Sequence, residues 1–364
     1  MHVNLEKRTL SSCCSASSVP IDREWLNNNP GKLFNHQSLV EDRQKMLDNK
    51  PCASCETACW SQEAQGLDSR RTRLQRTQKT HVEIYTKPET INLHLGSTCN
   101  MSCAYCGPHS SSSWVNDVKL NGDYGIDEER ARLTDKDILI SKLGQKAVVN
   151  STPYTELLDE IKTYKNATSL DLTGGEPFLY NNIEQLISGF SGSIRIQSGL
   201  GVDSNRLTRM LDLLPLGRTT LTISAENIDK FYEFNRYGNT YKRFLNNLEI
   251  IRSRNIKFTF RPTLSNLTVF GFSDFLEYFK NEEIHPLPCT DPKYLKMHLI
   301  DTASKQKICD TDYGPFTDFI HKAVKLDVEE NDRLTLKKFL FEYSSRRKLD
   351  LGLFPKSFVE WLSV

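Results

Sequence analysis

Strand-like and helix-like patterns alternate along the middle of the chain, and this alternation limits the folds that the chain can adopt. Short apolar or alternating runs predict six strands, at residues 91–95, 169–173, 194–198, 219–224, 257–263 and 284–288. Periodic apolar residues between them predict helices at residues 154–165, 183–190, 204–214, 241–254 and 273–279. Such alternation is typical of βαβ units that build a parallel sheet. We therefore expect an α/β fold that gathers its ligands at the carboxyl ends of the strands.

The first predicted strand leads directly into a three-cysteine motif. Cys99, Cys103 and Cys106 follow it with spacings of three and then two intervening residues. Three thiolates on one short loop can hold three irons of a [4Fe–4S] cluster and leave the fourth iron open for another ligand. The alternatives are a zinc knuckle that takes His94 or His109 as its fourth ligand, or three unrelated buried thiols.

Two further motifs lie at the ends of predicted strands. Gly174, Gly175 and Glu176 follow the strand at residues 169–173, and glycines at such a turn let a ligand approach the backbone closely. Taken alone, this turn is an ordinary one in which the next residue, a proline, starts a helix. The strand at residues 219–224 likewise ends in small and polar residues.

On these motifs the chain resembles the radical S-adenosylmethionine (SAM) superfamily, in which an aromatic residue, here Tyr105, precedes the last cysteine. The resemblance implies that Cys99, Cys103 and Cys106 bind a [4Fe–4S] cluster whose open iron chelates SAM. It also implies that an electron from the cluster splits SAM into methionine and a 5′-deoxyadenosyl radical, which takes a hydrogen atom from the substrate. The fold that it implies is a partial (β/α)6 barrel.

The same resemblance implies roles for residues around SAM. It places Gly174, Gly175 and Glu176 at the SAM amino group, Tyr105 beside the adenine and Ser224 at the ribose. Arg236 either meets the SAM carboxylate or is an exposed helix arginine. The chain departs from the family where Thr-Asn-Gly often follows the third strand, because it has Gln-Ser-Gly at residues 197–199.

A second group of cysteines, Cys52, Cys55 and Cys59, lies upstream. It indicates an auxiliary iron–sulfur cluster or a zinc site, and the alternative is structural thiols under a helix. Candidates for a fourth ligand are Cys289 and Cys309, whereas the adjacent Cys13 and Cys14 are not expected to be ligands. From about Cys52 to the C-terminus the chain resembles the twitch-domain subgroup of radical SAM proteins.

Four segments follow from these patterns. Residues 1–50 are expected to be a polar, partly disordered lead, and its first 20 residues lack an apolar core of signal-peptide length. Residues 51–88 form a Cys-containing extension with a basic segment. Residues 89–288 form the radical SAM partial barrel, with an insertion at about 107–150. Residues 289–364 form a twitch-like, helical C-terminal region, with helices expected at 316–328, 334–347 and 355–362.

Composition indicates the cellular compartment and the classes of partner to expect for this protein. The chain is 38% hydrophobic and 26% charged, and it has no run of the ~20 apolar residues that a membrane span needs. Ten cysteines without an export signal favour metal ligation in a reducing, cytoplasmic compartment. The net charge of +1 gives no general attraction to nucleic acid. A basic run at residues 70–79 is able to bind RNA phosphates, but it lacks aromatic residues for stacking, and a solvated segment is the commoner explanation.

The substrate is expected to be a peptide or protein side chain, because twitch-type relatives commonly modify these. The alternatives are a small-molecule radical SAM dehydrogenase or other oxidoreductase, an RNA-modifying enzyme, and a non-catalytic iron–sulfur binding protein. An electron donor of the flavodoxin or ferredoxin type is an expected partner.

Overall fold

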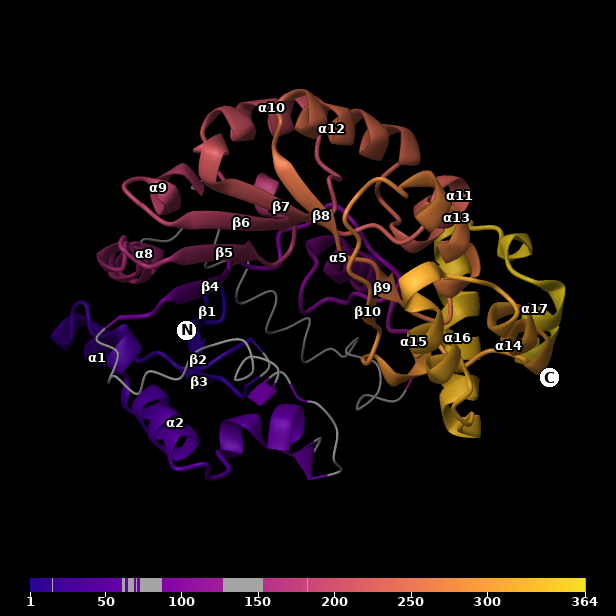
Figure 1. The fold of residues 1–364 in the computed structure, drawn as a ribbon, viewed down its shortest axis with the longest axis horizontal. Coiled ribbons are helices and arrows are strands. Elements are labelled where there is room, and N and C mark those ends of the chain that lie inside the picture. Colours follow the sequence, from indigo (N-terminus) through magenta and orange to yellow (C-terminus); the bar gives the residue numbers. More distant parts are fainter. Residues whose placement is uncertain are drawn as a thin grey trace. The chain divides into compact units, whose positions relative to one another are not determined.

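The computed structural model describes residues 1–14, 16–60, 63–64, 69, 71–72, 87–126, 153–181 and 183–363. Contacts divide the chain into two compact units (Figure 1). Unit 1 comprises residues 1–96, 144–174 and 181–196, and unit 2 comprises residues 97–143, 175–180 and 197–364. Of the predicted basic run at residues 70–79, all but residues 71 and 72 lie outside the described residues.

Unit 1 is built on a mostly parallel sheet with the strand order β3-β2-β1-β4-β5-β6. Strand β1 pairs in parallel with β4, β4 with β5 and β5 with β6, whereas the β1–β2 and β2–β3 pairs are antiparallel. The predicted parallel α/β fold is thus confirmed. The strands are β1 (His2–Asn4), β2 (Thr9–Ser11), β3 (Val19–Pro20), β4 (Thr90–His94), β5 (Ser169–Thr173) and β6 (Ser193–Ser198), which leads into unit 2.

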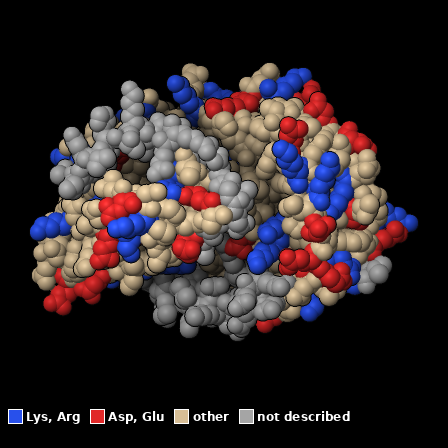
Figure 2. Space-filling view, turned by 60° about the horizontal axis from the view of Figure 1, so that its bottom comes forward, with Lys and Arg blue, Asp and Glu red and all other residues tan. Residues whose placement is uncertain are grey.

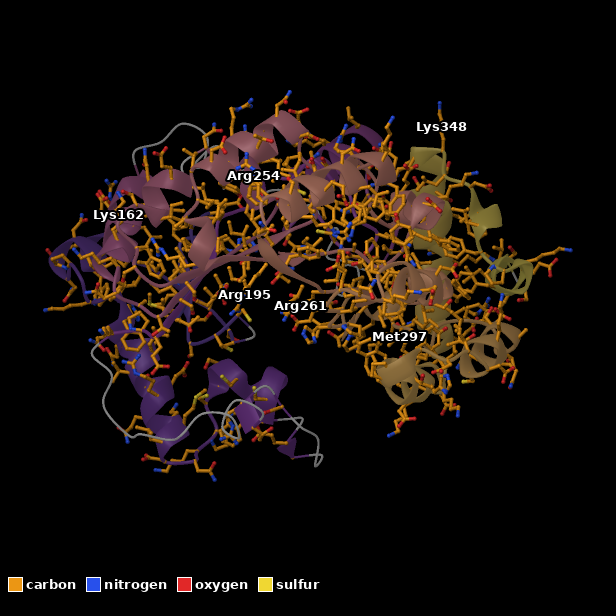
Figure 3. The ribbon with its side chains drawn as sticks, turned by 45° about the horizontal axis from the view of Figure 1, so that its top comes forward. Lys162, Arg195, Arg254, Arg261, Met297 and Lys348 are labelled. Atoms are coloured by element: carbon orange, nitrogen blue, oxygen red, sulfur yellow. The ribbon has the colours of Figure 1, made fainter. Side chains whose placement is uncertain are left out.

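One face of this sheet is apolar and buried, and the other is polar. Alternate residues such as Leu93, Leu172 and Ile194 are fully buried, and Figure 1 shows α8 and α9 along the sheet. On the opposite face Arg195 of β6 lies 3.2 Å from Asp171 of β5, and Figure 3 shows Arg195 on the open side of the sheet. The helices of unit 1 are α1 (Arg23–Asn28), α2 (Gln37–Leu47), α8 (Pro153–Thr163) and α9 (Ile183–Ile187).

The first 20 residues differ from the sequence-based expectation. A disordered lead was the prediction, whereas the structure forms β1, β2 and β3 there. Val3 pairs with Leu93 of β4 and Leu10 pairs with Val3, and both Val3 and Leu10 are fully buried. Each of these strands has only two or three residues and at most one buried apolar side chain, so the sequence shows no periodic pattern there.

Unit 2 contains two parallel strand pairs, β7 (Thr219–Ile223) with β8 (Lys257–Phe260) and β9 (Thr263–Leu264) with β10 (Leu287–Pro288). Helices pack around an aromatic core in which the Phe260 ring centroid lies 4.6 Å from that of Phe279 and 5.3 Å from that of Phe275. The helices are α5 (Ser112–Asn121), α10 (Ser204–Asp212), α11 (Asp229–Asn235), α12 (Tyr241–Ser253), α13 (Phe272–Tyr278), α14 (Thr302–Cys309), α15 (Thr317–Val324), α16 (Glu330–Arg347) and α17 (Lys356–Ser363).

The last two predicted strands are shorter than expected. The strand predicted at residues 257–263 is split into β8 and β9, and the one at 284–288 is reduced to an isolated bridge between Ile284 and Phe260 and to the two residues of β10. Pro262 separates β8 from β9, and Pro286 follows the bridge. Proline has no N–H to donate to a neighbouring strand, so both ladders stop at these residues.

Helix α16 holds two loops of unit 2. The hydroxyl of Tyr343 lies 2.9 Å from the carbonyl oxygen of Ser102 and 3.0 Å from that of Phe234. Arg346 donates to the carbonyl oxygen of Gly122 at 2.8 Å, and Arg347 donates to the hydroxyl of Tyr124 at 2.7 Å. The C-terminal helix therefore fixes both the loop around Ser102 and the chain that follows α5.

The surface carries both signs of charge. Figure 2 shows Lys and Arg side chains interspersed with Asp and Glu side chains on the face that it draws. Among the described residues, no helix combines the length and the apolar character needed to cross a membrane.

Candidate functional site

The three-cysteine loop is folded onto itself in unit 2. Cys99, Met101 and Cys103 are buried in one cluster, against which Tyr105 and Cys106 pack. The N–H of Cys106 donates to the carbonyl oxygen of Cys103 at 3.0 Å, which closes a turn between the last two cysteines. The loop therefore brings the three predicted ligands together.

Serine residues just after the motif clamp this loop. The Ser112 hydroxyl donates to the carbonyl oxygen of Cys99 at 2.8 Å and accepts from the Cys99 N–H at 3.0 Å. Ser111, which caps the N-terminus of α5, donates to the carbonyl oxygen of Met101 at 2.6 Å. The indole N–H of Trp114 donates to the carbonyl oxygen of Cys103 at 3.0 Å. The start of the predicted insertion is thus a support for the cysteine loop.

The glycine-rich turn leads to a fully buried carboxylate. Gly174 and Gly175 adopt φ angles of 90° and 49°, which favour glycine. Glu176 is 0% exposed, and its carboxylate accepts hydrogen bonds from the Ser198 hydroxyl at 2.8 Å and the Gly199 N–H at 3.1 Å. Burial raises the pKa of Glu176, and these donors oppose the shift.

The N–H of Glu176 in turn donates to the carbonyl oxygen of Thr98, directly before the first cysteine, at 2.9 Å. Residue 176 therefore connects the cysteine loop to residues 198–199. Residues 197–199, Gln-Ser-Gly, depart from the sequence pattern of the family. The Ser198 hydroxyl nevertheless makes a polar contact in this loop, because it donates to the carboxylate of Glu176.

A buried ion pair lies beside the cysteine loop. Arg236 binds Glu226 through two nitrogens at 2.9 and 2.5 Å, and the two side chains are 5% and 1% exposed. A third nitrogen of Arg236 donates to the sulfur of Cys103 at 3.7 Å. The alternative that Arg236 is an exposed helix arginine is therefore wrong.

Tyr105 and Ser224 complete this neighbourhood. The Tyr105 hydroxyl donates to Glu226 at 2.8 Å, and its ring centroid lies 5.1 Å from the guanidinium carbon of Arg236. The N–H of Ser224 donates to the carbonyl oxygen of Ser198 at 2.9 Å. Glu226 was not identified from the sequence, although it follows Ser224 by two residues at the end of the same strand.

The electrostatics of the cysteine loop are those of neutral thiols beside a fixed cation. Burial raises the pKa of Cys99 well above its ordinary value, and the charge of Cys103 adds to this. Burial also raises the pKa of Cys103, whereas Arg236 opposes that shift. A cationic iron centre reverses this situation because it stabilises thiolates.

The donor set fits an iron–sulfur cluster. Within the described residues, no three His, Cys, Asp or Glu side chains are already arranged as the ligands of one metal ion. A [4Fe–4S] cluster does not need that arrangement, because each cysteine binds a different iron. Three thiols on one loop, whose backbone is held by Ser111, Ser112 and Trp114, supply the ligands that such a cluster uses.

Gly238 contacts the cysteine loop so closely that its substitution tests the loop's packing. Its φ is 100°, and a Cβ there would overlap the carbonyl oxygen of Asn100 and lie 3.0 Å from the Cα of Met101. We expect Gly238→Ala to destabilise the protein by more than the about 1–2 kcal/mol that left-handed backbone costs an L-residue, and to lower iron loading. Urea unfolding and iron analysis measure both effects.

Gly314→Ala is the matched control for this substitution. Gly314 also has a positive φ, 58°, but nothing lies within 4 Å of an added Cβ. The control is expected to show the backbone cost alone and to keep its iron. Equal destabilisation by the two substitutions would contradict the close contact at Gly238.

The upstream cysteines form a separate cluster in unit 1. Cys52, Cys55 and Cys59 are buried together, with Ala16, Met46 and Trp60 packed against them. Burial raises the pKa of Cys55 to about 12. Of the predicted candidates for a fourth ligand, Cys289 is buried and Cys309 half-buried, and both belong to unit 2. In the described part of the chain, no cysteine forms a disulfide.

A family model described as Radical SAM superfamily matches residues 93–278 of the chain. This match begins in β4 and ends at the last residue of α13, so it includes the cysteine loop, the glycine-rich turn and the Glu226–Arg236 pair. The search of curated proteins found no significant match.

Several solved structures are similar to the chain. One is native anSMEcpe with bound AdoMet, with 15% identity and a TM-score of 0.39 over 71% of this chain and 61% of that chain. Another is SuiB of Streptococcus suis bound to precursor peptide SuiA, with 13% identity and a TM-score of 0.35 over 73% and 48%. A third is TYW1 with a lysine-pyruvate adduct bound, with 17% identity and a TM-score of 0.34 over 79% and 84%. The chain thus spans less than two thirds of the length of the first two.

Proposed function

The chain belongs to the radical SAM superfamily, and from this premise we propose that Cys99, Cys103 and Cys106 hold its [4Fe–4S] cluster. Membership makes the chain an enzyme and implies SAM as the second cofactor. The observation that carries the assignment is the junction of the cysteine loop with the glycine-rich turn, through the hydrogen bond between the Glu176 N–H and Thr98. When bound, the cluster and SAM would supply a 5′-deoxyadenosyl radical that abstracts a hydrogen atom from the substrate.

We assign the SAM contacts to residues around this junction. Gly174 and Gly175 offer backbone carbonyls to the SAM amino group, and the charge of Glu176 adds to their effect. Ser224 binds the ribose, and Tyr105 packs beside the adenine. Two hydrogen bonds support this assignment, one between Ser198 and Glu176 and one between Ser224 and Ser198. They connect the loops that contain these residues within unit 2.

Arg236 and Glu226 hold the cysteine loop from its other side. The guanidinium of Arg236 reaches the sulfur of Cys103, and Glu226 fixes both Arg236 and the hydroxyl of Tyr105. Their contribution is orientation of the ligands and charge balance. The cofactors carry out the difficult chemistry in such enzymes, while the protein positions them and excludes water.

For the substrate we propose a peptide or protein side chain, as the resemblance to the twitch-domain subgroup suggests. The net charge of +1 supports this choice over RNA, because a polyanion favours a predominantly basic protein. A flavodoxin or ferredoxin is the proposed electron donor.

Anaerobic reconstitution tests the proposal. Iron and sulfide are quantified per chain, and dithionite with SAM is added to look for 5′-deoxyadenosine. We expect at least about four irons, as one [4Fe–4S] cluster requires, and formation of 5′-deoxyadenosine. A loaded cluster that never yields this product, with peptide, small-molecule or RNA substrates present, would contradict the proposed activity.

Substrate class is a separate question with its own measurement. Candidate peptides, such as one encoded beside the gene, are incubated with SAM deuterated at the 5′ carbon or followed for mass change. Peptide-dependent stimulation of 5′-deoxyadenosine formation is the expected result. Stimulation by RNA that is lost on replacing the basic residues at 70–79 would instead favour RNA modification.

A further inference from the structure

We propose that unit 1 contains a second metal site whose four ligands are thiolates from two segments of the chain, Cys13, Cys52, Cys55 and Cys59. Such a site is separate from the SAM cluster and does not depend on the assignment of the substrate. Cys13 is the ligand that the sequence analysis did not predict. The argument rests on the fold of the two segments.

The first segment presents three buried thiols within eight residues. Cys52, Cys55 and Cys59 are 0%, 1% and 4% exposed. A one-turn 3₁₀ helix, Ala53–Cys55, brings the first two together, with the Cys55 N–H donating to the carbonyl oxygen of Cys52 at 3.0 Å. Turns of this kind in C-x2-C motifs place two thiolates on one metal ion.

The second segment, residues 12–17, contains Cys13 and contacts the segment of the three buried cysteines. The Ser17 N–H donates to the carbonyl oxygen of Ser54 at 2.7 Å, and Ala16 packs against the three buried cysteines. On the other side of Cys13, the Ser12 hydroxyl donates to Asp42, which also accepts from the Ser54 hydroxyl at 2.7 Å. The residues on both sides of Cys13 are therefore connected to Ser54, Ser17 directly and Ser12 through Asp42.

A lid of side chains covers the cluster. Trp60 and Met46 pack against the buried cysteines. The guanidinium carbon of Arg71 lies 3.9 Å from the centroid of the Trp60 ring, and Arg71 forms an ion pair with Glu63. Trp60 and Met46 thus help to separate the thiols from solvent, as a stable metal site requires.

Four thiolates form a soft donor set that selects zinc or iron–sulfur clusters. Binding of a divalent ion would displace the four thiol protons to solvent and involve no change of oxidation state. The C-x2-C spacing of Cys52 and Cys55 is typical of structural zinc sites. The thiols do not yet have the positions of ligands around one ion, so binding requires rotation of their side chains.

The test uses the full chain with Cys99, Cys103 and Cys106 replaced by Ala, which removes the SAM cluster from the metal count. Zinc, iron and sulfide are measured after purification and after anaerobic reconstitution. We expect this triple variant to retain about one zinc, or about four irons with sulfide if the site takes a cluster. Either metal supports the site, and the sulfide content distinguishes the two. A triple variant that contains no metal after both treatments would overturn the proposal.

Cys14→Ala is the matched control for Cys13→Ala, because the two cysteines are neighbours and Cys14 is exposed. In the triple variant, Cys13→Ala is expected to weaken zinc retention against a chromogenic chelator at least tenfold, whereas Cys14→Ala leaves it unchanged. Equal effects of the two, or loss of metal on replacing Cys289 or Cys309 instead, would exclude Cys13 as the fourth ligand.

Cobalt substitution separates ligand loss from misfolding. Co²⁺ bound by thiolates gives sulfur-to-metal absorption that grows with the number of thiolate ligands, so Cys13→Ala should lower it by about a quarter if four thiolates bind. Its circular dichroism should match that of Cys14→Ala. The same Cys13→Ala substitution in the chain with native Cys99, Cys103 and Cys106 should keep the iron and SAM cleavage of the SAM site, and loss of that iron would contradict the separation of the two sites.

Discussion

Replacement of Cys103 by alanine is expected to abolish SAM cleavage and to remove about four irons per chain, the content of one [4Fe–4S] cluster. Cys103 lies at the centre of the site: it is buried with Cys99, it follows the carbonyl oxygen that Tyr343 binds, and its sulfur accepts from Arg236. In a cluster held by three cysteines, one of the four irons has no protein thiolate. Loss of Cys103 would leave a second iron in that state. Iron analysis, visible absorption and 5′-deoxyadenosine assay measure the result.

Cys289→Ala is the control for this substitution. Cys289 is also a buried thiol of unit 2, and its sulfur donates to the carbonyl oxygen of Asp291 at 3.6 Å. The control removes the same atoms from a buried position and is expected to keep both SAM-site iron and product formation. A Cys103→Ala protein that still cleaves SAM, with the control unaffected, would rule out Cys103 as a cluster ligand.

Arg236→Met is expected to lower the free energy of unfolding by about 3–5 kcal/mol, because it leaves Glu226 as an unpaired charge in the interior. Glu226 is 1% exposed, and no solvent replaces the two hydrogen bonds that Arg236 supplies. Urea unfolding of the reconstituted protein measures the change. Iron content is expected to fall as well, since the sulfur of Cys103 loses its donor.

Two further variants show whether this cost comes from the isolated charge. The double variant Glu226→Gln with Arg236→Met removes both charges, and its destabilisation should be clearly smaller than the sum of the single ones. Lys280→Ala breaks an exposed ion pair with Glu277 and should leave the free energy of unfolding nearly unchanged. An Arg236→Met cost as small as that of Lys280→Ala would contradict the burial of the pair.

Strands and motifs could be predicted from the sequence where a few consecutive residues carry the whole pattern. Strand β5 has the predicted bounds, and the cysteine loop follows β4 as expected, because a run of apolar residues and a tight spacing of cysteines are both readable over a few positions. The parallel α/β fold followed from the alternation of such runs. The ligands that we propose for the cluster can be predicted for the same reason.

Contacts between distant segments were not predictable in this way. Ser198 meets Glu176, 22 positions earlier, and Tyr105 meets Glu226, 121 positions later. The sequence alone is consistent with either a SAM-contacting or an exposed Arg236, and its buried ion pair with Glu226 excludes the exposed position. The sequence does not indicate Cys13 as a ligand, because its connection to Ser54 runs through distant residues, with Ser17 bound to Ser54 directly and Ser12 bound through Asp42.

The support that α16 gives to the cysteine loop has a consequence for the order of events in the cell. Tyr343 follows Ser102, whose carbonyl oxygen it binds, by 241 residues. At ~5–20 residues per second, a ribosome needs roughly 10 to 50 seconds to add that length of chain. During this interval the cysteine loop has left the ribosome without its C-terminal support. Delivery of iron and sulfide is therefore expected to follow translation rather than accompany it, and early exposure to oxygen would damage the thiols before the loop is closed.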